Sequence, residues 1–207
     1  NQIDPDAEPF AVMLEEYEPY VGVDTVERVL ENLKEALVPL IDEIRASDVD
    51  PSGPFVERGP YDEDTQMALS EDALSFVQCD WDRARLDTSP HPFSYGNRYD
   101  MRITTRFHDH SPIDGLDSSL HEYGHATYEM GLDEDGFPSP LGQSRSHSIH
   151  ESQSRFWENH VGRSEAFWEQ FLPIVQKHFP RLSDVGPREA YEAANQVYED
   201  NLIRVEA

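Results

Sequence analysis

The sequence is poor in positive charge. Its 207 residues include 16 Lys and Arg side chains against 42 Asp and Glu, so the formal net charge at pH 7 is -26. A chain with this charge repels nucleic-acid phosphates and anionic lipid headgroups alike. The composition therefore excludes nucleic acid as an expected partner and argues against binding at a membrane surface.

Cysteine and long apolar segments are also nearly absent. Cys79 is the only cysteine, so the chain cannot form an internal disulfide, and a reducing compartment fits best. No apolar run reaches the roughly 18 residues needed to cross a bilayer, and the first residues do not resemble a signal peptide. We therefore expect a cytoplasmic protein with no membrane segment.

Carboxylate side chains are in excess, and they are spread along the chain instead of forming one acidic tail. Dense negative charge of this kind is self-repulsive unless a high salt concentration screens it. No D-x-[DN]-x-[DN]-G loop is present, so an EF-hand calcium site does not explain the acidity. We interpret the composition as that of a halophilic protein of haloarchaeal type.

The pattern of apolar residues is mainly helical. Between Val26 and Ile44, apolar residues recur every three or four positions, and similar patterns occur in several later segments. These segments are residues 62–79, 118–130, 148–162, 164–178 and 189–207. From Tyr99 to Thr105 the period changes to two, after a Gly96-Asn97 turn signal, which predicts a small β-hairpin. We predict a mainly α-helical, single-domain chain with this hairpin near the functional site.

The strongest local signal is an H-E-x-x-H motif formed by His121, Glu122 and His125. Residues four positions apart lie on the same side of a helix, so the two imidazoles can hold one metal ion. Zinc bound by three protein ligands keeps a position open for water. Glu122 follows the first histidine and is placed to act as the general base on that water.

Several residues could supply the third ligand. The metzincin class requires a histidine where this chain has Gly131, so that class is excluded. Glu151 follows His125 on a separate predicted helix, and the loop between the two helices is long enough for them to lie side by side. One carboxylate and two imidazoles form an established catalytic ligand set. We favour Glu151; the alternatives are Asp133, Asp135, His147 and His150.

Five short blocks of sequence resemble, in order, those of the carboxypeptidase Taq family of metallocarboxypeptidases. They are His91-Pro92-Phe93, a D-x-R-x-T block from Asp100, the H-E-x-x-H motif, His150-Glu151-Ser152-Gln153, and Ile203 to Ala207, which begins an I-R-x-x-A-D block. The resemblance implies a mostly helical zinc-peptidase (gluzincin) fold with zinc at His121, His125 and Glu151. It also implies a homodimer that removes C-terminal residues from peptides.

Members of this family are about twice as long as the chain. The resemblance therefore implies that residues 1–207 are a catalytic-core fragment that lacks an N-terminal and a C-terminal portion of the parent enzyme. The sequence does not determine which metal is bound: zinc is expected, and cobalt and manganese are possible substitutes. A zinc endopeptidase or oligopeptidase with the same ligands, and a non-catalytic fragment of such an enzyme, remain alternatives.

An enzyme that removes C-terminal residues must bind the free carboxylate of its substrate. A guanidinium group does this well through paired hydrogen bonds, so Arg102 and Arg204 are candidates. His91, which lies between two prolines, is a candidate substrate contact in a rigid loop. The alternative is that the arginines form structural ion pairs and that His91 is a packed loop residue.

Overall fold

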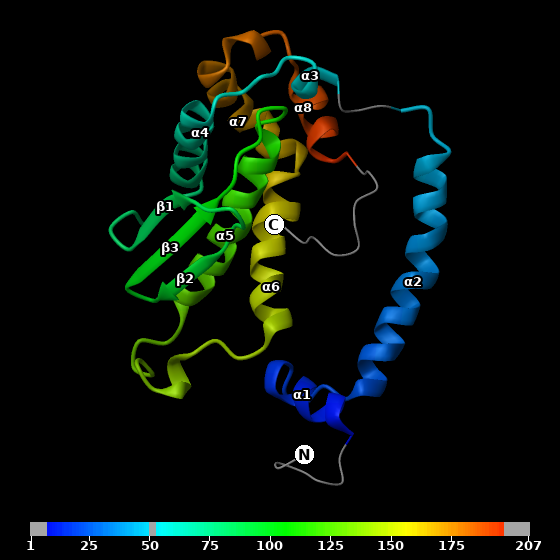
Figure 1. The fold of residues 1–207 in the computed structure, drawn as a ribbon, viewed down its shortest axis with the longest axis vertical. Helices are drawn as coiled ribbons and strands as arrows, with labels where there is room; N and C mark the ends of the chain where they lie inside the picture. Colours follow the sequence, from blue (N-terminus) through cyan, green and yellow to red (C-terminus); the bar gives the residue numbers. More distant parts are fainter. Residues whose placement is uncertain (1–7, 50–52, 197–207) are drawn as a thin grey trace. The chain divides into compact units, whose positions relative to one another are not determined.

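The structure is a computed structural model that describes residues 8–49 and 53–196 (Figure 1). Most of the described residues are helical and one small sheet is present, which confirms the prediction of a mainly α-helical fold with a hairpin. The chain divides into two compact units. The first comprises Asn1–Val49 and Arg145–His150, and the second comprises Asp50–Ser144 and Glu151–Ala207. None of the helices in the described ranges has the length and apolar character of a membrane span.

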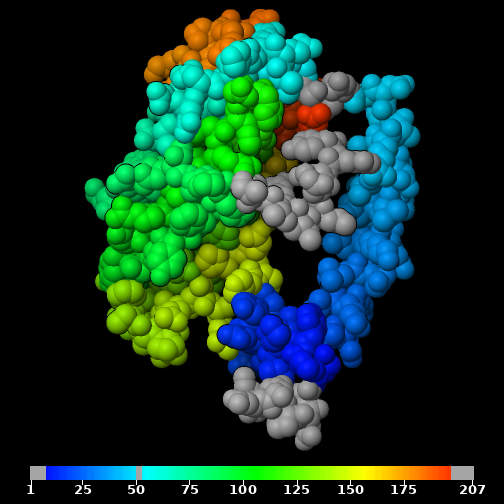
Figure 2. Space-filling view, in the orientation of Figure 1, coloured from blue at the N-terminus to red at the C-terminus, as the bar shows by residue number. Residues whose placement is uncertain are grey.

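The first unit contains helices α1 (Pro9–Tyr17) and α2 (Val23–Arg45). Glu8 caps α1, because its carboxylate accepts a hydrogen bond of 2.8 Å from the backbone N–H of Ala11. Helix α2 has the predicted spacing of apolar residues, but no residue along it is buried. Its side chains form open surface in the space-filling view (Figure 2).

Glu18 holds the beginning of helix α6 (His147–Arg155). Its carboxylate accepts hydrogen bonds of 2.7 Å from the hydroxyls of Ser146 and Ser148, and another from the backbone N–H of Ser148. Burial alone would raise the pKa of Glu18, but these hydrogen bonds outweigh burial and lower it. Hydrogen bonds to Glu18 therefore stabilise the first turn of the helix that carries Glu151.

The second unit contains the other helices, including a π-helical segment that continues α6. They are α3 (Gly53–Val56), α4 (Glu63–Phe76), α5 (Ile113–Gly131), η1 (Pro140–Gly142), the π-helix η2 (Phe156–Gly162), α7 (Glu165–His178), η3 (Pro180–Leu182) and α8 (Pro187–Ala194). Side-chain caps begin α4 and α7, because Asp62 accepts a hydrogen bond from the N–H of Thr65 and Ser164 accepts one from the N–H of Phe167.

Helix α5 packs against the sheet, α4 and η2. It begins at Ile113, five positions earlier than the sequence pattern predicted. The reason is that Ile113, Leu116 and Leu120 continue the same buried stripe toward the N-terminus. The H-E-x-x-H motif therefore lies in the middle of a long, well-packed helix.

The sheet has three strands in the order β1-β3-β2. Strands β2 (Ser94–Asn97) and β3 (Asp100–Thr105) are antiparallel and form the predicted hairpin, with Gly96 opposite Met101. Strand β1 (Ala84–Thr88) pairs in parallel with β3 and was not anticipated from the sequence. The hairpin prediction is confirmed, but Gly96 and Asn97 belong to β2 and the turn falls at Arg98 and Tyr99. The third strand is an addition to the prediction.

One face of β3 is turned toward α5. Met101, Ile103 and Thr105 are buried on this face, and the hydroxyl of Thr105 donates a 3.0 Å hydrogen bond to the carbonyl of Gly115 in α5. Because side chains alternate along a strand, Arg102 lies on the opposite face. The sheet thus covers one side of the helix that carries the H-E-x-x-H motif.

Candidate metal centre

His121 and His125 lie one turn apart on the same side of α5. Their ring centroids are 5.0 Å apart, and both side chains are mostly buried. This arrangement follows from helical geometry, because residues four positions apart project from the same face. The motif therefore presents two imidazoles to one point in space.

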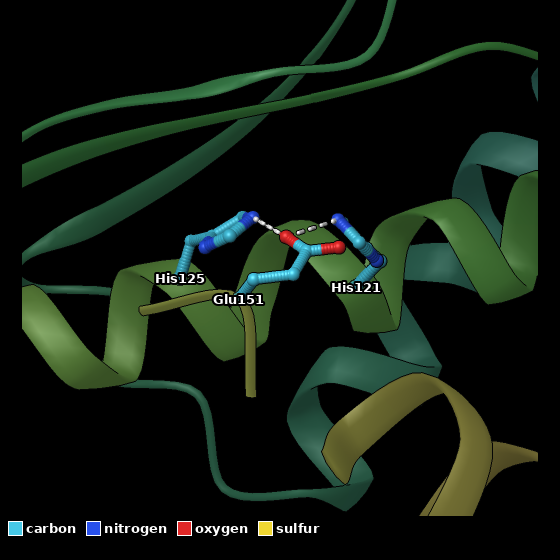
Figure 3. A group of neighbouring side chains, drawn as sticks. All are labelled: His121, His125 and Glu151. Atoms are coloured by element: carbon cyan, nitrogen blue, oxygen red, sulfur yellow. Dashed lines mark ion pairs between the residues drawn. The ribbon is translucent and has the colours of Figure 1, made fainter. Parts of the chain in front are cut away.

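Glu151 brings a carboxylate to that point from α6. Its Oε2 atom lies 3.3 Å from Nε2 of His125 and 3.8 Å from Nε2 of His121, and its carboxylate lies between the two rings (Figure 3). The ligand atoms of the three residues all lie within 4.8 Å of one another. Within the described ranges, this is the only group of His, Cys, Asp or Glu side chains found close enough together to hold a metal ion.

The donor set suits a divalent ion such as zinc. Nitrogen and oxygen ligands about 2.1 Å from a tetrahedral ion lie about 3.4 Å from one another. The two measured separations, 3.3 Å and 3.8 Å, bracket that value. The three side chains therefore fit such an ion with little rearrangement, and among the described residues no fourth side chain joins the group.

The other oxygen of Glu151 is bound by an arginine. Arg155, one turn later on the same helix, donates a 2.9 Å hydrogen bond from Nε to Oε1 of Glu151. Burial alone would raise the pKa of Glu151, but hydrogen bonds from Ser154 and Arg155 and the charge of His121 lower it. Glu151 is therefore kept ionised with Oε2 turned toward the histidines.

Glu122 is buried beside the three clustered side chains. Burial raises its pKa, while a hydrogen bond from Ser94 and the charges of His121 and His91 partly oppose that shift. Ser94 belongs to the hairpin, so strand β2 helps to hold this carboxylate. A carboxyl group with a raised pKa is suited to accept and return a proton.

Glu158 lies behind His121 and was not identified from the sequence. One of its carboxylate oxygens, Oε2, lies 2.8 Å from Nδ1 of His121. Burial alone would lower the pKa of His121, but this hydrogen bond and nearby carboxylates raise it, and the pKa of Glu158 is lowered in turn. A signal was present, because Glu151 and Glu158 are two helical turns apart and share a face.

The other predicted site residues are placed differently. The charge of His91 lowers the pKa of Glu122, so His91 lies in the neighbourhood of the candidate metal centre. Arg102 is half exposed on the sheet face opposite α5 and forms a 2.8 Å ion pair with Asp100. Arg204 lies outside the described residues. The alternative ligand His147 instead packs against the ring of Tyr17 in the first unit.

A helical fold with an H-E-x-x-H helix and a glutamate from a second helix defines a metallopeptidase type of site. Consistent with this, a model of the carboxypeptidase Taq (M32) metallopeptidase family matches residues 1–207. The chain belongs to this family.

Curated relatives are similar over nearly the whole chain. Thermostable carboxypeptidase 1 of Thermus thermophilus is 39% identical over 204 residues, which cover 98% of this chain and 40% of that protein. Thermostable carboxypeptidase 1 of Pyrococcus furiosus is 37% identical over 203 residues, which cover 97% of this chain and 40% of that protein. The chain therefore spans 40% of the length of these relatives.

Solved structures have the same fold over this region. The crystal structure of M32 carboxypeptidase from Deinococcus radiodurans gives a TM-score of 0.84 at 39% identity, covering 89% of this chain and 37% of that chain. Metallocarboxypeptidase 1 of Trypanosoma cruzi gives a TM-score of 0.84 at 28% identity, covering 99% of this chain and 41% of that chain.

Proposed function

We propose that the protein is a zinc-dependent metallocarboxypeptidase that releases C-terminal amino acids from peptides. The observation that carries the proposal is the position of Glu151, whose Oε2 atom faces Nε2 of both His121 and His125. Membership of the carboxypeptidase Taq family supports the substrate class, since the relatives are named as carboxypeptidases.

In this proposal His121, His125 and Glu151 hold the metal ion, and Glu122 is the general base. A bound zinc ion would polarise the peptide carbonyl and lower the pKa of bound water. Glu122 takes the proton of the attacking water and passes it to the leaving amine, so that the water adds to the carbonyl as the C–N bond breaks. The raised pKa of Glu122, caused mainly by burial, favours this temporary retention of the proton.

Three further residues are proposed to contact the substrate. The proposed role of His91 is supported by its position near Glu122, whose pKa the charge of His91 lowers. Arg102 would have to exchange Asp100 for the terminal carboxylate of the peptide, because the two side chains already form an ion pair. Arg204 remains a second candidate for that carboxylate. If either arginine has this role, its replacement by alanine raises KM for peptides with a free carboxylate more than for amidated peptides.

The metal, the assembly and the compartment are also part of the proposal. Zinc suits two imidazoles and a carboxylate, and cobalt and manganese are the alternatives to test. The proposed homodimer is what the resemblance to the family implies. The proposed cytoplasmic compartment of high salt agrees with Cys79 as the only cysteine and with the net charge of -26.

The deciding experiment combines metal analysis with peptide hydrolysis. The chain and a version extended to the length of the relatives are compared with the same proteins carrying Glu122→Gln. We expect bound zinc in all of them and loss of hydrolysis in the variant, because an amide cannot accept the proton. An active Glu122→Gln enzyme, or a protein that takes up no divalent metal, would refute the proposal.

The pattern of products separates the two peptidase alternatives. A carboxypeptidase releases single amino acids from a peptide with a free C-terminus and leaves its amidated form intact. Internal cleavage of a peptide blocked at both ends would identify an endopeptidase with the same ligands instead.

A further inference from the structure

We propose that Glu158 is a positioning residue that fixes the ring of His121 for metal binding. The inference deepens the proposed function, and it rests on His121 being a ligand. Glu158 Oε2 lies 2.8 Å from Nδ1 of His121, while Nε2 at the other end of the ring faces Glu151. The ring is thus held at one nitrogen and presented at the other.

The hydrogen bond to Glu158 also selects the tautomer of His121. An ionised carboxylate can only accept hydrogen bonds, so Nδ1 of His121 must carry the hydrogen in this contact. In the neutral ring, Nε2 then has its lone pair free and directed toward Glu151 and His125. This is the tautomer that a metal ion at the three-residue cluster requires.

Two arginines compensate the buried charge of Glu158. Its side chain is 11% exposed, Arg155 Nη1 lies 3.0 Å from Oε2, and Arg163 Nη2 lies 2.9 Å from Oε1. A buried carboxylate is costly unless it is paired and hydrogen-bonded in this way. Arg155 also binds Oε1 of Glu151, so the two glutamates and His121 belong to one connected set of hydrogen bonds.

The backbone geometry brings Glu158 to this position. It lies in the π-helix η2, which continues the helix that carries Glu151, and π-helical turns frequently occur at functional sites. Gly162 at the end of η2 allows close packing on α5, because a Cβ there would lie 2.7 Å from Cδ1 of Leu120. The helix that supplies the carboxylate ligand thus also supplies the group behind the first histidine.

Asp117 provides a matched control for this proposal. It binds the same atom of Arg163 as Glu158 does: Asp117 Oδ2 lies 3.0 Å, and Glu158 Oε1 2.9 Å, from Nη2. Replacing Asp117 by asparagine therefore disturbs the same buried ion-pair group without removing the hydrogen bond to His121. A merely structural role of Glu158 predicts similar effects of both substitutions on metal binding.

The test measures zinc affinity by competition with a chromophoric chelator in the wild type, Glu158→Ala, Glu158→Gln and Asp117→Asn. We expect the dissociation constant to rise about 10- to 100-fold in Glu158→Ala, by a smaller factor in Glu158→Gln, and less than about threefold in Asp117→Asn. Unchanged affinity in folded Glu158→Ala, or an equal loss in Asp117→Asn, would overturn the positioning role. If Glu158→Ala does not fold, the zinc dissociation constants of Glu158→Gln and Asp117→Asn are compared instead. A larger rise in Glu158→Gln supports the positioning role, and an equal rise overturns it.

A second measurement separates this inference from the proposed function. In metal-free protein, nitrogen-15 NMR of the histidine rings, at a pH where His121 is neutral, reports which ring nitrogen carries the hydrogen. We expect Nδ1–H in the wild type and a mixture of tautomers in Glu158→Ala. If the wild type binds no zinc and the tautomer still depends on Glu158, the proposed function fails and the orienting contact stands. If the tautomer is the same in both proteins, the inference fails regardless of activity.

Discussion

Gly124 lies directly against the backbone of Ser154, where α5 and α6 meet. A Cβ atom at position 124 would come within 2.5 Å of Cα of Ser154 and within 2.5 Å of the carbonyl oxygen of Gln153. Both contacts are with backbone atoms, which cannot move aside as a flexible side chain could. The absence of a side chain at Gly124 therefore allows the helix with Glu151 to approach the helix with the two histidines.

Gly124→Ala is expected to separate these helices. The added methyl group should lower the free energy of unfolding by about 1–3 kcal/mol and weaken metal binding, because Glu151 moves away from the imidazoles. Gly131→Ala is the matched control, since a Cβ there meets nothing within 4 Å. It should be neutral or slightly stabilising through helix propensity. Chemical denaturation and zinc titration measure both effects, and equal behaviour of the two variants would contradict the packing argument.

Glu151→Ala is expected to remove the third ligand. Loss of a residue that only supports a ligand typically lowers metal affinity about 10- to 100-fold. The loss in Glu151→Ala should be larger than that. Glu169→Ala is the control, because Glu169 is an exposed glutamate on α7 that does not belong to the three-residue group. This variant removes the same charge as Glu151→Ala. Zinc content after dialysis against a weak chelator is the measurement. Full zinc occupancy in Glu151→Ala would assign the third position to another residue.

Asp117 is expected to make stability depend on pH. Burial raises its pKa to about 7 from the ordinary value of 3.8, although Arg163 partly opposes the shift. The folded state therefore binds a proton that the unfolded state has already lost between these two values. Stability falls as pH rises through this window, by at most about 1.4 kcal/mol per pH unit for one proton.

Asp117→Asn removes this titration. Urea unfolding between pH 4 and pH 8 at constant salt should show a smaller loss of stability with rising pH in the variant than in the wild type. The window follows from the two pKa values of Asp117. Parallel stability curves for the two proteins would show that Asp117 does not titrate across this range.

High salt is expected to stabilise the protein. A net charge of -26 on 207 residues is strongly self-repulsive, and ions screen that repulsion. Thermal unfolding should therefore occur at a higher temperature in multimolar potassium chloride than at low ionic strength. A sucrose series is the control, because sucrose is excluded from the protein surface but does not screen charge. Higher stability at low salt would contradict a halophilic adaptation.

The hairpin could be predicted because its signal is local. Alternation from Tyr99 to Thr105 and the Gly96-Asn97 turn signal lie within one short stretch of sequence, although the turn itself falls at Arg98 and Tyr99. Strand β1 could not be found in this way, since its short run has only Ala84 and Leu86 as apolar residues and is otherwise polar or charged. It is a strand because it pairs in parallel with β3, and such a ladder depends on a partner that is distant in sequence.

The common face of His121 and His125 could be predicted for a similar reason. Their spacing in an H-E-x-x-H motif has one consequence on a helix, whatever surrounds that helix. Glu158 was missed because its seven-residue spacing from Glu151 is a weak signal in a chain with so many glutamates. Its burial, and its contact with Nδ1 of His121, exist only once η2 lies against α5.

By itself the sequence determined the excess of negative charge, the helical periodicity and the common face of His121 and His125, because each of these is a property of neighbouring residues or of composition. Only the tertiary structure decided that Glu151 faces both imidazoles and that Glu158 contacts one of them. These separations depend on how closely two helices pack, and at Gly124 a side chain would collide with the backbone of the helix that carries Glu151.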